Sequence, residues 1–369
     1  MIRLALGVLA ALLVMASVST DALRSNVSIQ ESSPQYSPQD IAQLQAQAKS
    51  GDPTAQLKLA RAFAQGNGVP ASEEMAAEWF RKAAEQGNAE AQDTLGAILL
   101  VGQGIERDKQ QAVTWYLKSA RQGNASAMFH LGAAYYNGDG VKTDDSLSYA
   151  WFLLAKEAGN ANAVEAVQRA ESELQPRVIT RSFKKIAEIY EKGGSLPENQ
   201  AEAARWWLKA ATRGDEDAEV AIAIKYINGQ GVAQDFSQAK NWCSQVAKEG
   251  NAPGAYCMGY MAQHGMGAAS NLKEARKWYE RAGQSGHIPA MKRLAQMETA
   301  GEGGKVDRPA ACLIYARLAS AGDQDALRHL AKLKKDIDAK EWQKLEKQMS
   351  MMRIDPYKLN LALQQIETQ

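Results

Sequence analysis

The sequence has few of the residues and charges on which active sites, metal centres and nucleic-acid-binding surfaces depend. Its 369 residues include three Cys and four His, and 43 Lys and Arg nearly balance 42 Asp and Glu. Three Cys are too few for the framework of a disulfide-stapled small domain. A formal net charge of +1 gives no field that would favour nucleic acid or an anionic membrane surface. We therefore expect no nucleic-acid partner.

Recognisable catalytic motifs are also missing. The four histidines occupy unrelated positions without a ligand spacing such as H-E-x-x-H: His130, His264, His287 and His329. The sequence has no G-x-S-x-G elbow and no Walker-type loop. The sequence therefore predicts a protein that is not an enzyme and that needs no metal and no cofactor.

One long apolar run lies at the N-terminus. After Arg3, residues Leu4 to Val18 carry no charge, and this run is shorter than the roughly 20 residues that cross a bilayer. We predict that residues 1–22 are a signal peptide for export to the periplasm or the medium, with an uncleaved membrane anchor as the alternative. Membrane contact is expected only in the second case. Residues 23–39, rich in Ser, Gln and Pro, are predicted to form a disordered spacer.

Glycines recur with a period of 36 residues in two series. The series are Gly51, Gly87, Gly123 and Gly159, then Gly214, Gly250, Gly286 and Gly322. Seven of the eight are followed by Asp or Asn, and the exception is His287. Glycine lets a helix end in the left-handed conformation, and Asp or Asn caps the next helix. Each site is therefore predicted to end one helix and begin another.

A second turn recurs fifteen residues after six of these glycines, and once more within the segment between the two series. It begins at Gly66, Gly102, Gly138, Gly193, Gly229, Gly265 and Gly301. Good N-cap residues follow at Ser72, Asp108, Asp144, Asn199, Asp235, Asn271 and Asp307. Each repeat is therefore predicted to contain a first helix, a Gly-x-Gly loop and a second helix.

The predicted helix interiors repeat in the same phase. Large apolar residues share one position of the first helix: Leu59, Leu95, Leu131, Ile222, Met258 and Leu294. The next position holds only Ala or Gly. Six of the eight tryptophans share one position of the second helix: Trp79, Trp115, Trp151, Trp206, Trp242 and Trp278. Large and small residues in register predict that neighbouring repeats bury a shared core.

The combined pattern is A-x-x-x-L-G-x-x-[YL]-x-x-G-x-G-[VI] followed by [AS]-x-x-W-[YF]-x-x-[AS]-A-x-x-G. Clear copies are Ala91–Ile105 with Ala112–Gly123, and Ala127–Val141 with Ser148–Gly159. This pattern resembles the Sel1-like repeat family, over about residues 51–345. The resemblance implies an all-α, α/α superhelical solenoid of seven 36-residue helix-turn-helix repeats. It also implies that the first helices line the concave face.

The repeats are predicted to form two arrays of three and four. Residues 40–176 hold repeats 1–3 and a capping helix, because Ala161–Leu174 ends at a proline without a Gly-x-Gly loop. Residues 177–337 hold repeats 4–7, and residues 338–369 form a C-terminal helical cap. Within this cap, Met351–Leu363 either packs back on the array or binds a partner.

Two cysteines are placed for a disulfide. Cys243 lies seven residues before Gly250 and Cys257 lies seven after it. In antiparallel helices joined at that turn, the two thiols would stand at the same height. We predict that they form a disulfide; the alternative is two small buried thiols. Cys312 has no evident partner.

Partner-binding residues are expected on the face of the first helix opposite the apolar stripe. Positions six, ten and thirteen after the boundary glycine lie there. They include the aromatic residues Phe129, Tyr136, Tyr256 and Tyr260, which we predict to contact a partner because aromatics contribute much of the energy of interfaces. The alternative is that these rings fill space between repeats.

The predicted function is a protein-protein interaction scaffold of the bacterial cell envelope, periplasmic or secreted, whose concave face binds partners. The resemblance implies partners in an envelope complex or a host protein. A rival of another class is a protein that binds or hydrolyses cell-wall muropeptides or β-lactams. The rival's Cys-rich relatives have recurring Cys pairs that this chain lacks, and no nucleophile-base pair is visible.

Overall fold

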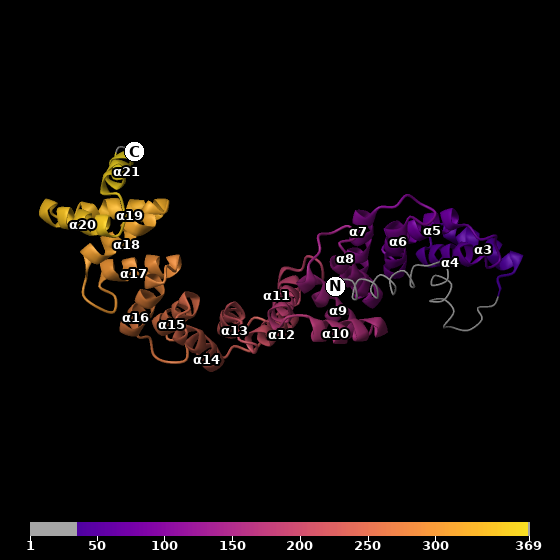
Figure 1. The fold of residues 1–369 in the computed structure, drawn as a ribbon, viewed down its shortest axis with the longest axis horizontal. Helices are drawn as coiled ribbons and strands as arrows, with labels where there is room; N and C mark the ends of the chain where they lie inside the picture. Colours follow the sequence, from indigo (N-terminus) through magenta and orange to yellow (C-terminus); the bar gives the residue numbers. More distant parts are fainter. Residues whose placement is uncertain (1–34, 368–369) are drawn as a thin grey trace. The chain divides into compact units, whose positions relative to one another are not determined.

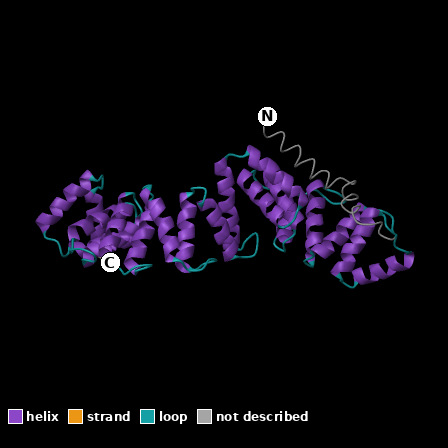
Figure 2. Ribbon diagram, turned by 90° about the horizontal axis from the view of Figure 1, so that it is seen from below, coloured by secondary structure: helices purple, strands orange, loops and turns teal. Residues whose placement is uncertain are grey.

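The computed structural model describes residues 35–367, and every regular element among them is a helix (Figures 1 and 2). The predicted signal peptide and most of the predicted spacer lie outside these residues. The chain forms two compact units that divide after Ala210, called unit 1 and unit 2 below. Among the described helices, none combines the length and the apolar character that crossing a membrane would demand.

The helices follow the predicted turns. Unit 1 contains α3 Pro38–Lys49, α4 Pro53–Gln65, α5 Glu73–Glu85, α6 Ala89–Val101, α7 Lys109–Ala120, α8 Ala125–Asn137, α9 Asp145–Glu157, α10 Ala161–Glu173, α11 Pro176–Lys192 and all but the last residue of α12 Gln200–Ala211. Unit 2 contains α13 Glu216–Asn228, α14 Phe236–Lys248, α15 Ala252–His264, α16 Leu272–Gln284, α17 Ile288–Ala300, α18 Arg308–Ser320, α19 Gln324–Lys334, α20 Ala339–Met351 and α21 Pro356–Glu367.

Turn chemistry sets these boundaries as the sequence predicts. Gly102 ends α6 in the left-handed region with φ 82°, and Asn88 begins α6 by accepting a hydrogen bond from the Ala91 amide at 2.9 Å. The expected exception at His287 is wrong. Its Nδ1 accepts a hydrogen bond from the amide of Ala290 at 3.2 Å, so it caps α17 as Asn or Asp does elsewhere.

The two helices of a repeat approach closely where an aromatic ring of the second helix packs against a glycine of the first helix. A Cβ atom added to Gly132 of α8 would lie 2.6 Å from ring carbons of Phe152 in α9. Gly96 faces Tyr116 in the same way, at 2.7 Å from the nearest ring carbon. These second-helix rings come directly after the tryptophan position. That following position is buried in all seven repeats: Phe80, Tyr116, Phe152, Trp207, Cys243, Tyr279 and Tyr315.

The tryptophans themselves have a less uniform environment than predicted. Trp79, Trp151 and Trp206 are buried, but the three others in the series are half-buried: Trp115, Trp242 and Trp278. A cation covers several of them; the Lys118 ammonium lies 3.7 Å from the centre of the Trp115 ring. The position after the tryptophan is therefore the more constant part of the shared core, because it is buried in all seven repeats, whereas the tryptophan is buried in three repeats and half-buried in three.

A ladder of glutamines connects the first repeats. The Gln92 side chain donates a hydrogen bond to the backbone oxygen of Ala84 at 3.0 Å. Its own side-chain oxygen accepts from Gln122 of the next boundary at 2.8 Å. Gln56 makes the same two kinds of contact one repeat earlier. An amide suits this position because it is both donor and acceptor.

In unit 2 a carboxyl group takes the ladder position. Glu219 is 2% exposed, and its Oε1 accepts a hydrogen bond from Gln245 at 3.1 Å. Its Oε2 is buried without a hydrogen-bond partner. Burial raises the pKa of Glu219, and the nearby carboxylates of Glu249, Glu216 and Asp215 raise it further.

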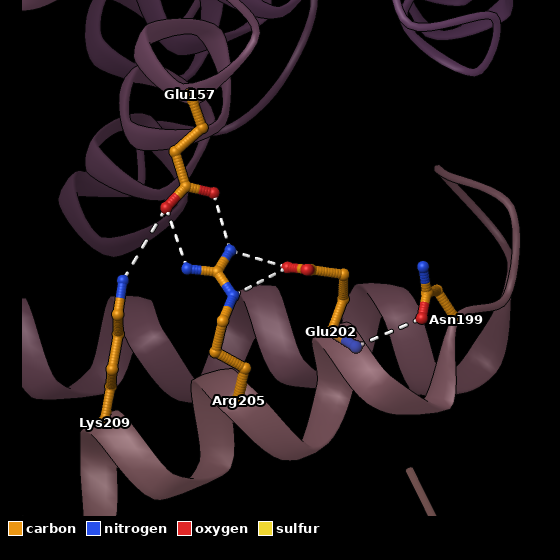
Figure 3. Close-up of polar contacts among 5 residues, drawn as sticks. All are labelled: Glu157, Asn199, Glu202, Arg205 and Lys209. Carbon is orange, nitrogen blue, oxygen red and sulfur yellow. Dashed lines mark hydrogen bonds and ion pairs between the residues drawn. The ribbon is translucent and has the colours of Figure 1, made fainter.

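The packing continues across the predicted break between arrays. Helix α10 packs on α9 as the predicted capping helix should, but α11 packs on α9 as well. The guanidinium of Arg205 in α12 also binds Glu157 of α9 at 2.7 Å and its neighbour Glu202 (Figure 3). Lys209 adds an ion pair to Glu157 at 3.6 Å. Helices α11 and α12 are thus fastened to α9, and the division into units falls after Ala210 instead of after residue 176.

The last residues of the predicted spacer, 35–39, are among those that the structure describes. Ser37 and Asp40 form a capping box at the start of α3, and the amide of Tyr36 donates a hydrogen bond to the side-chain oxygen of Asn67 at 2.9 Å. The prediction of a disordered spacer is therefore wrong for residues 35–39. Ser and Pro suggested disorder by composition, although Ser-Pro-x-Asp is also a helix start.

The C-terminal segment packs back onto the array. Helix α21 packs on α19 and α18, and its residues Leu359 and Leu363 are buried in the same core as Leu330. The Lys334 ammonium of α19 donates a hydrogen bond to the side-chain oxygen of Asn360 at 3.0 Å. The first of the two alternatives for this segment therefore describes α21.

Replacing Gly132 by Ala should destabilise unit 1. The added methyl would overlap the Phe152 ring, and overpacking of this kind costs about 1–3 kcal/mol, which exceeds the roughly 1 kcal/mol gained in helix propensity. Thermal unfolding followed by circular dichroism measures the effect. Gly194→Ala is the control, because a Cβ there meets no atom within 4 Å. Equal stability of the two variants would contradict the ring-on-glycine contact.

Replacing Glu219 by Gln should stabilise unit 2 increasingly as the pH rises. The folded-state pKa of Glu219 is raised, so the folded protein binds more protons than the unfolded chain. The contribution of Glu219 to stability is therefore present below its unfolded pKa and is lost as the pH rises through its folded pKa. Unfolding temperatures at pH 4 and pH 8 measure this, and Gln92→Glu should create the same pH dependence in unit 1. A pH-independent difference between Glu219→Gln and the wild type would contradict the assignment.

Candidate functional site

Each unit has a groove lined mainly by the first helices of its repeats. The unit 1 groove has a volume of about 430 Å³ and is lined by Arg61, Ala64, Gln65, Phe80, Glu90, Asp93, Thr94, Ala97, Asn124, Ser126, Phe129, His130, Asn160 and Asn162. The unit 2 groove has a volume of about 440 Å³ and is lined by Val220, Ile224, Ile227, Asn228, Pro253, Tyr256, Cys257, Tyr260, His287 and Pro289. Both grooves include first-helix positions that the sequence predicts to face a partner.

The unit 1 groove is polar, and its charged groups pair with one another. Asp93 of α6 binds the Nδ1 atom of His130 of α8 at 2.8 Å, and Arg61 of α4 binds Glu90 of α6. The His130 ring also packs on the ring of Tyr116, with ring centres 4.9 Å apart. These contacts join successive first helices, so they fix the spacing of the repeats along the groove.

The unit 2 groove is apolar by contrast. Tyr256 and Tyr260 lie one turn apart on α15, with ring centres 6.5 Å apart. His287 continues the row, with its ring centre 4.7 Å from that of Tyr256. Ile224 of α13 is 44% exposed and Tyr260 is 36% exposed. The lining contains no Asp, Glu, Lys or Arg, so a partner with apolar side chains would desolvate little charge on entering it.

The structure separates the four predicted contact residues. Tyr256 and Tyr260 lie together in the unit 2 groove. Phe129 touches the unit 1 groove but is 2% exposed and packs on Phe152, with ring centres 5.3 Å apart, so it serves as core filler, the alternative that the sequence left open. Tyr136 is half-buried and is not part of either lining.

His287 is the groove residue that sequence reasoning missed. In the sequence it is the one boundary residue that is neither Asp nor Asn. Its position directly after Gly286 places it at the start of the first helix α17, next to the predicted contact face of α15. The predicted contact face consists of positions six, ten and thirteen after the boundary glycine, so it does not include the capping residue at position one.

Cys243 of α14 and Cys257 of α15 form a disulfide in the structure. Their Cα atoms are 5.9 Å apart, and Cys257 also lines the unit 2 groove beside Tyr256. The disulfide therefore joins the first helix that carries both tyrosines to the second helix of the preceding repeat. Cys312 is a free, buried thiol whose pKa burial raises to about 12.

The other histidines have structural contacts. The Nδ1 atom of His264 lies 2.9 Å from the backbone oxygen of Tyr260, and the His329 ring stacks on Tyr315 with ring centres 5.1 Å apart. Across residues 35–367, no three His, Cys, Asp or Glu side chains are grouped so as to hold a metal ion.

Mass spectrometry of the unreduced protein should show one disulfide. The intact mass should be two hydrogens below that of the reduced chain, with Cys243 and Cys257 in one linked peptide pair and Cys312 open to alkylation after unfolding. Cys243→Ser with Cys257→Ser should lower stability, by about 3 kcal/mol in the chain-entropy model for a loop of about 15 residues. An alkylated Cys257 in the unreduced, unfolded protein would contradict the assignment.

Comparison with known proteins agrees with the repeat architecture. A family model described as the Sel1 repeat matches residues 53–88, 89–124, 125–160, 185–215, 217–251, 252–287 and 288–323. The chain finds no match among curated proteins.

Solved structures of similar chains include other repeat proteins. A protective antigen present in uropathogenic Escherichia coli strains, which displays an SLR fold, is 28% identical, with 83% of this chain and 70% of that chain covered and a TM-score of 0.44. A Sel1 repeat protein from Oxalobacter formigenes is 25% identical, with 87% and 89% covered and a TM-score of 0.40. Because the family model matches seven segments that together make up more than half of the sequence, the chain belongs to the Sel1 repeat family.

Proposed function

We propose that this protein is a scaffold of the bacterial cell envelope that holds a partner protein in the unit 2 groove. Sel1 repeat proteins generally act as protein-protein interaction scaffolds. The observation that supports the site is the row of Tyr256, Tyr260 and Ile224, which stays partly exposed on a rigid helical frame. Exposed apolar patches on folded proteins usually mark interaction sites.

The groove suits a protein partner because its walls are already ordered. Tyr256 packs on Tyr279 of the core, with ring centres 5.5 Å apart. The Cys243–Cys257 disulfide links α15 covalently to α14. Little conformational entropy is then lost when a partner binds. Tyrosine adds a hydrogen-bonding hydroxyl at the end of an apolar ring, a combination that is common at interfaces.

Two features support a place in the envelope. The apolar run from Leu4 to Val18 has the length of a signal-peptide core. The Cys243–Cys257 disulfide would persist in an oxidising compartment such as the periplasm, whereas cytosolic reductants keep most thiols reduced.

The cell-wall alternative has less support in the grooves. Hydrolysis would need an acid, a base or a nucleophile free to act on a substrate. In the unit 1 groove the charged side chains Arg61, Glu90 and Asp93 are engaged with each other or with His130, and the unit 2 groove is apolar. Binding of a protein partner therefore remains the function that the geometry supports best.

Replacing Tyr256 and Tyr260 by Ser should reduce partner capture at least about thirty-fold, the scale of an interface hot spot. The measurement is crosslinking in intact cells followed by affinity purification and quantification of the captured proteins in the envelope fraction. Tyr357→Ser is the matched control, because Tyr357 is 77% exposed on α21 and is not a groove residue.

Because Tyr256 is half-buried, a second variant separates binding from folding. Ile224→Ser with Tyr260→Ser changes two of the more exposed groove residues, so it should also lose capture while its unfolding temperature stays close to that of the wild type. Undiminished capture by both groove variants, or capture only of cytosolic proteins, would count against the proposal.

A further inference from the structure

His287 has two roles that both require its neutral form. Its Nδ1 accepts the hydrogen bond from the Ala290 amide that caps α17, and its ring forms part of the apolar wall beside Tyr256. At the equivalent position Asn251 and Asn124 cap their helices with amide oxygens and Asp215 caps α13 with a carboxyl oxygen, and none of these groups becomes a cation in acid. Of the two grooves, only this one is lined by a capping histidine.

Protonation of His287 would have three consequences. A protonated Nδ1 becomes a donor, so the hydrogen bond from Ala290 is lost. The new charge would stand at the N-terminus of α17, where the helix dipole is already positive. It would also place a cation in a wall otherwise made of Tyr, Ile, Val and Pro side chains. The ring face of Tyr256 offsets part of this cost through a cation-π contact.

No other charge in the groove compensates for that proton. Helix α13 contributes Val220, Ile224, Ile227 and Asn228 to the lining, and α15 contributes Pro253, Tyr256, Cys257 and Tyr260, so neither helix adds an Asp, Glu, Lys or Arg side chain to it. On α17 itself, Lys292 is paired with Asp323. Burial lowers the pKa of His287, in agreement with this arrangement.

His264 shows the opposite arrangement at the other end of the tyrosine row. Its ring lies 4.1 Å from that of Tyr260, between ring centres, and its Nδ1 donates to the backbone oxygen of Tyr260 near the C-terminus of α15. That bond survives protonation, and the helix dipole favours the positive charge there. Acid should therefore disturb the His287 end of the row and leave the His264 end in place.

We propose that His287 makes the unit 2 groove acid-sensitive, so that the groove binds an apolar partner near neutral pH and releases it in acid. This inference rests on the groove being the binding site of the proposed function. Neutral His287 caps the start of α17 and packs against the Tyr256 ring. When it is protonated, its side chain leaves the cap and becomes hydrated.

The test uses the full chain and the neutral dye Nile red, whose fluorescence rises in apolar surroundings. Its dissociation constant is measured at pH 7.5 and pH 5.0. We expect the affinity of the wild type to fall about five-fold in acid, on the scale of one helix-capping hydrogen bond. His287→Asn keeps a cap of the kind used by Asn251, so its affinity should not change between the two pH values.

Two controls separate the possible outcomes. His264→Gln should keep the pH dependence of the wild type, and Tyr256→Ser with Tyr260→Ser should bind the dye weakly at both pH values. Equal pH dependence of the wild type and His287→Asn would overturn the role of His287 while leaving the groove as a binding site. Equal dye binding at pH 7.5 by the wild type and the double tyrosine variant would overturn the groove itself, and this inference with it.

Discussion

The contact between a second-helix ring and a first-helix glycine determines how closely the two helices of a repeat can approach. At Gly132 and Gly96 there is no room for even a methyl group, so the helices stand as near as backbone and ring allow. A two-helix unit is too thin to bury such a ring alone, and stacked neighbours complete its environment. The polar ladder depends on that spacing, because Gln92 must reach both its own turn and the next repeat.

One face of each first helix takes no part in this contact between ring and glycine, and the two units use this face differently. In unit 1 it carries paired charges such as Asp93 with His130, which join repeat to repeat. In unit 2 it carries Tyr256, Tyr260 and Ile224, which have aromatic neighbours on one side and solvent on the other. The same repeat scaffold can therefore carry a groove with paired charges in one unit and an apolar groove in the other, because the residues that define the repeat are turn and core residues.

Much of the fold was predictable because turn chemistry is local. A glycine followed by Asn or Asp determines a helix end and a helix start within a few residues, and these boundaries appear as expected. The break between arrays was harder, because whether α11 leaves α9 or stays on it depends on long-range contacts such as Arg205 with Glu157. The phase of the pattern draws attention to tryptophan, although the position that is buried in every repeat is the following one, such as Tyr116. Of the candidate contacts, Tyr256 and Tyr260 lie in a groove, while Phe129 is buried against the Phe152 ring of the second helix, a contact between helices that the position of Phe129 within its own helix does not reveal.

Unit 2 differs from unit 1 at two positions of its repeat boundaries, where it carries a capping histidine and a buried carboxyl group. His287 stands where Asn88 and Asn124 cap helices, and Glu219 stands where Gln92 bridges repeats. The lowered pKa of His287 means that its contribution to stability is lost as the pH falls, whereas the raised pKa of Glu219 means that its contribution is lost as the pH rises. His287 therefore limits the stability of unit 2 at low pH, and Glu219 limits it at high pH. Glu219 lies in the first turn of α13 and His287 caps α17, and both helices contribute residues to the unit 2 groove. A loss of stability at either residue would therefore act on the walls of this groove.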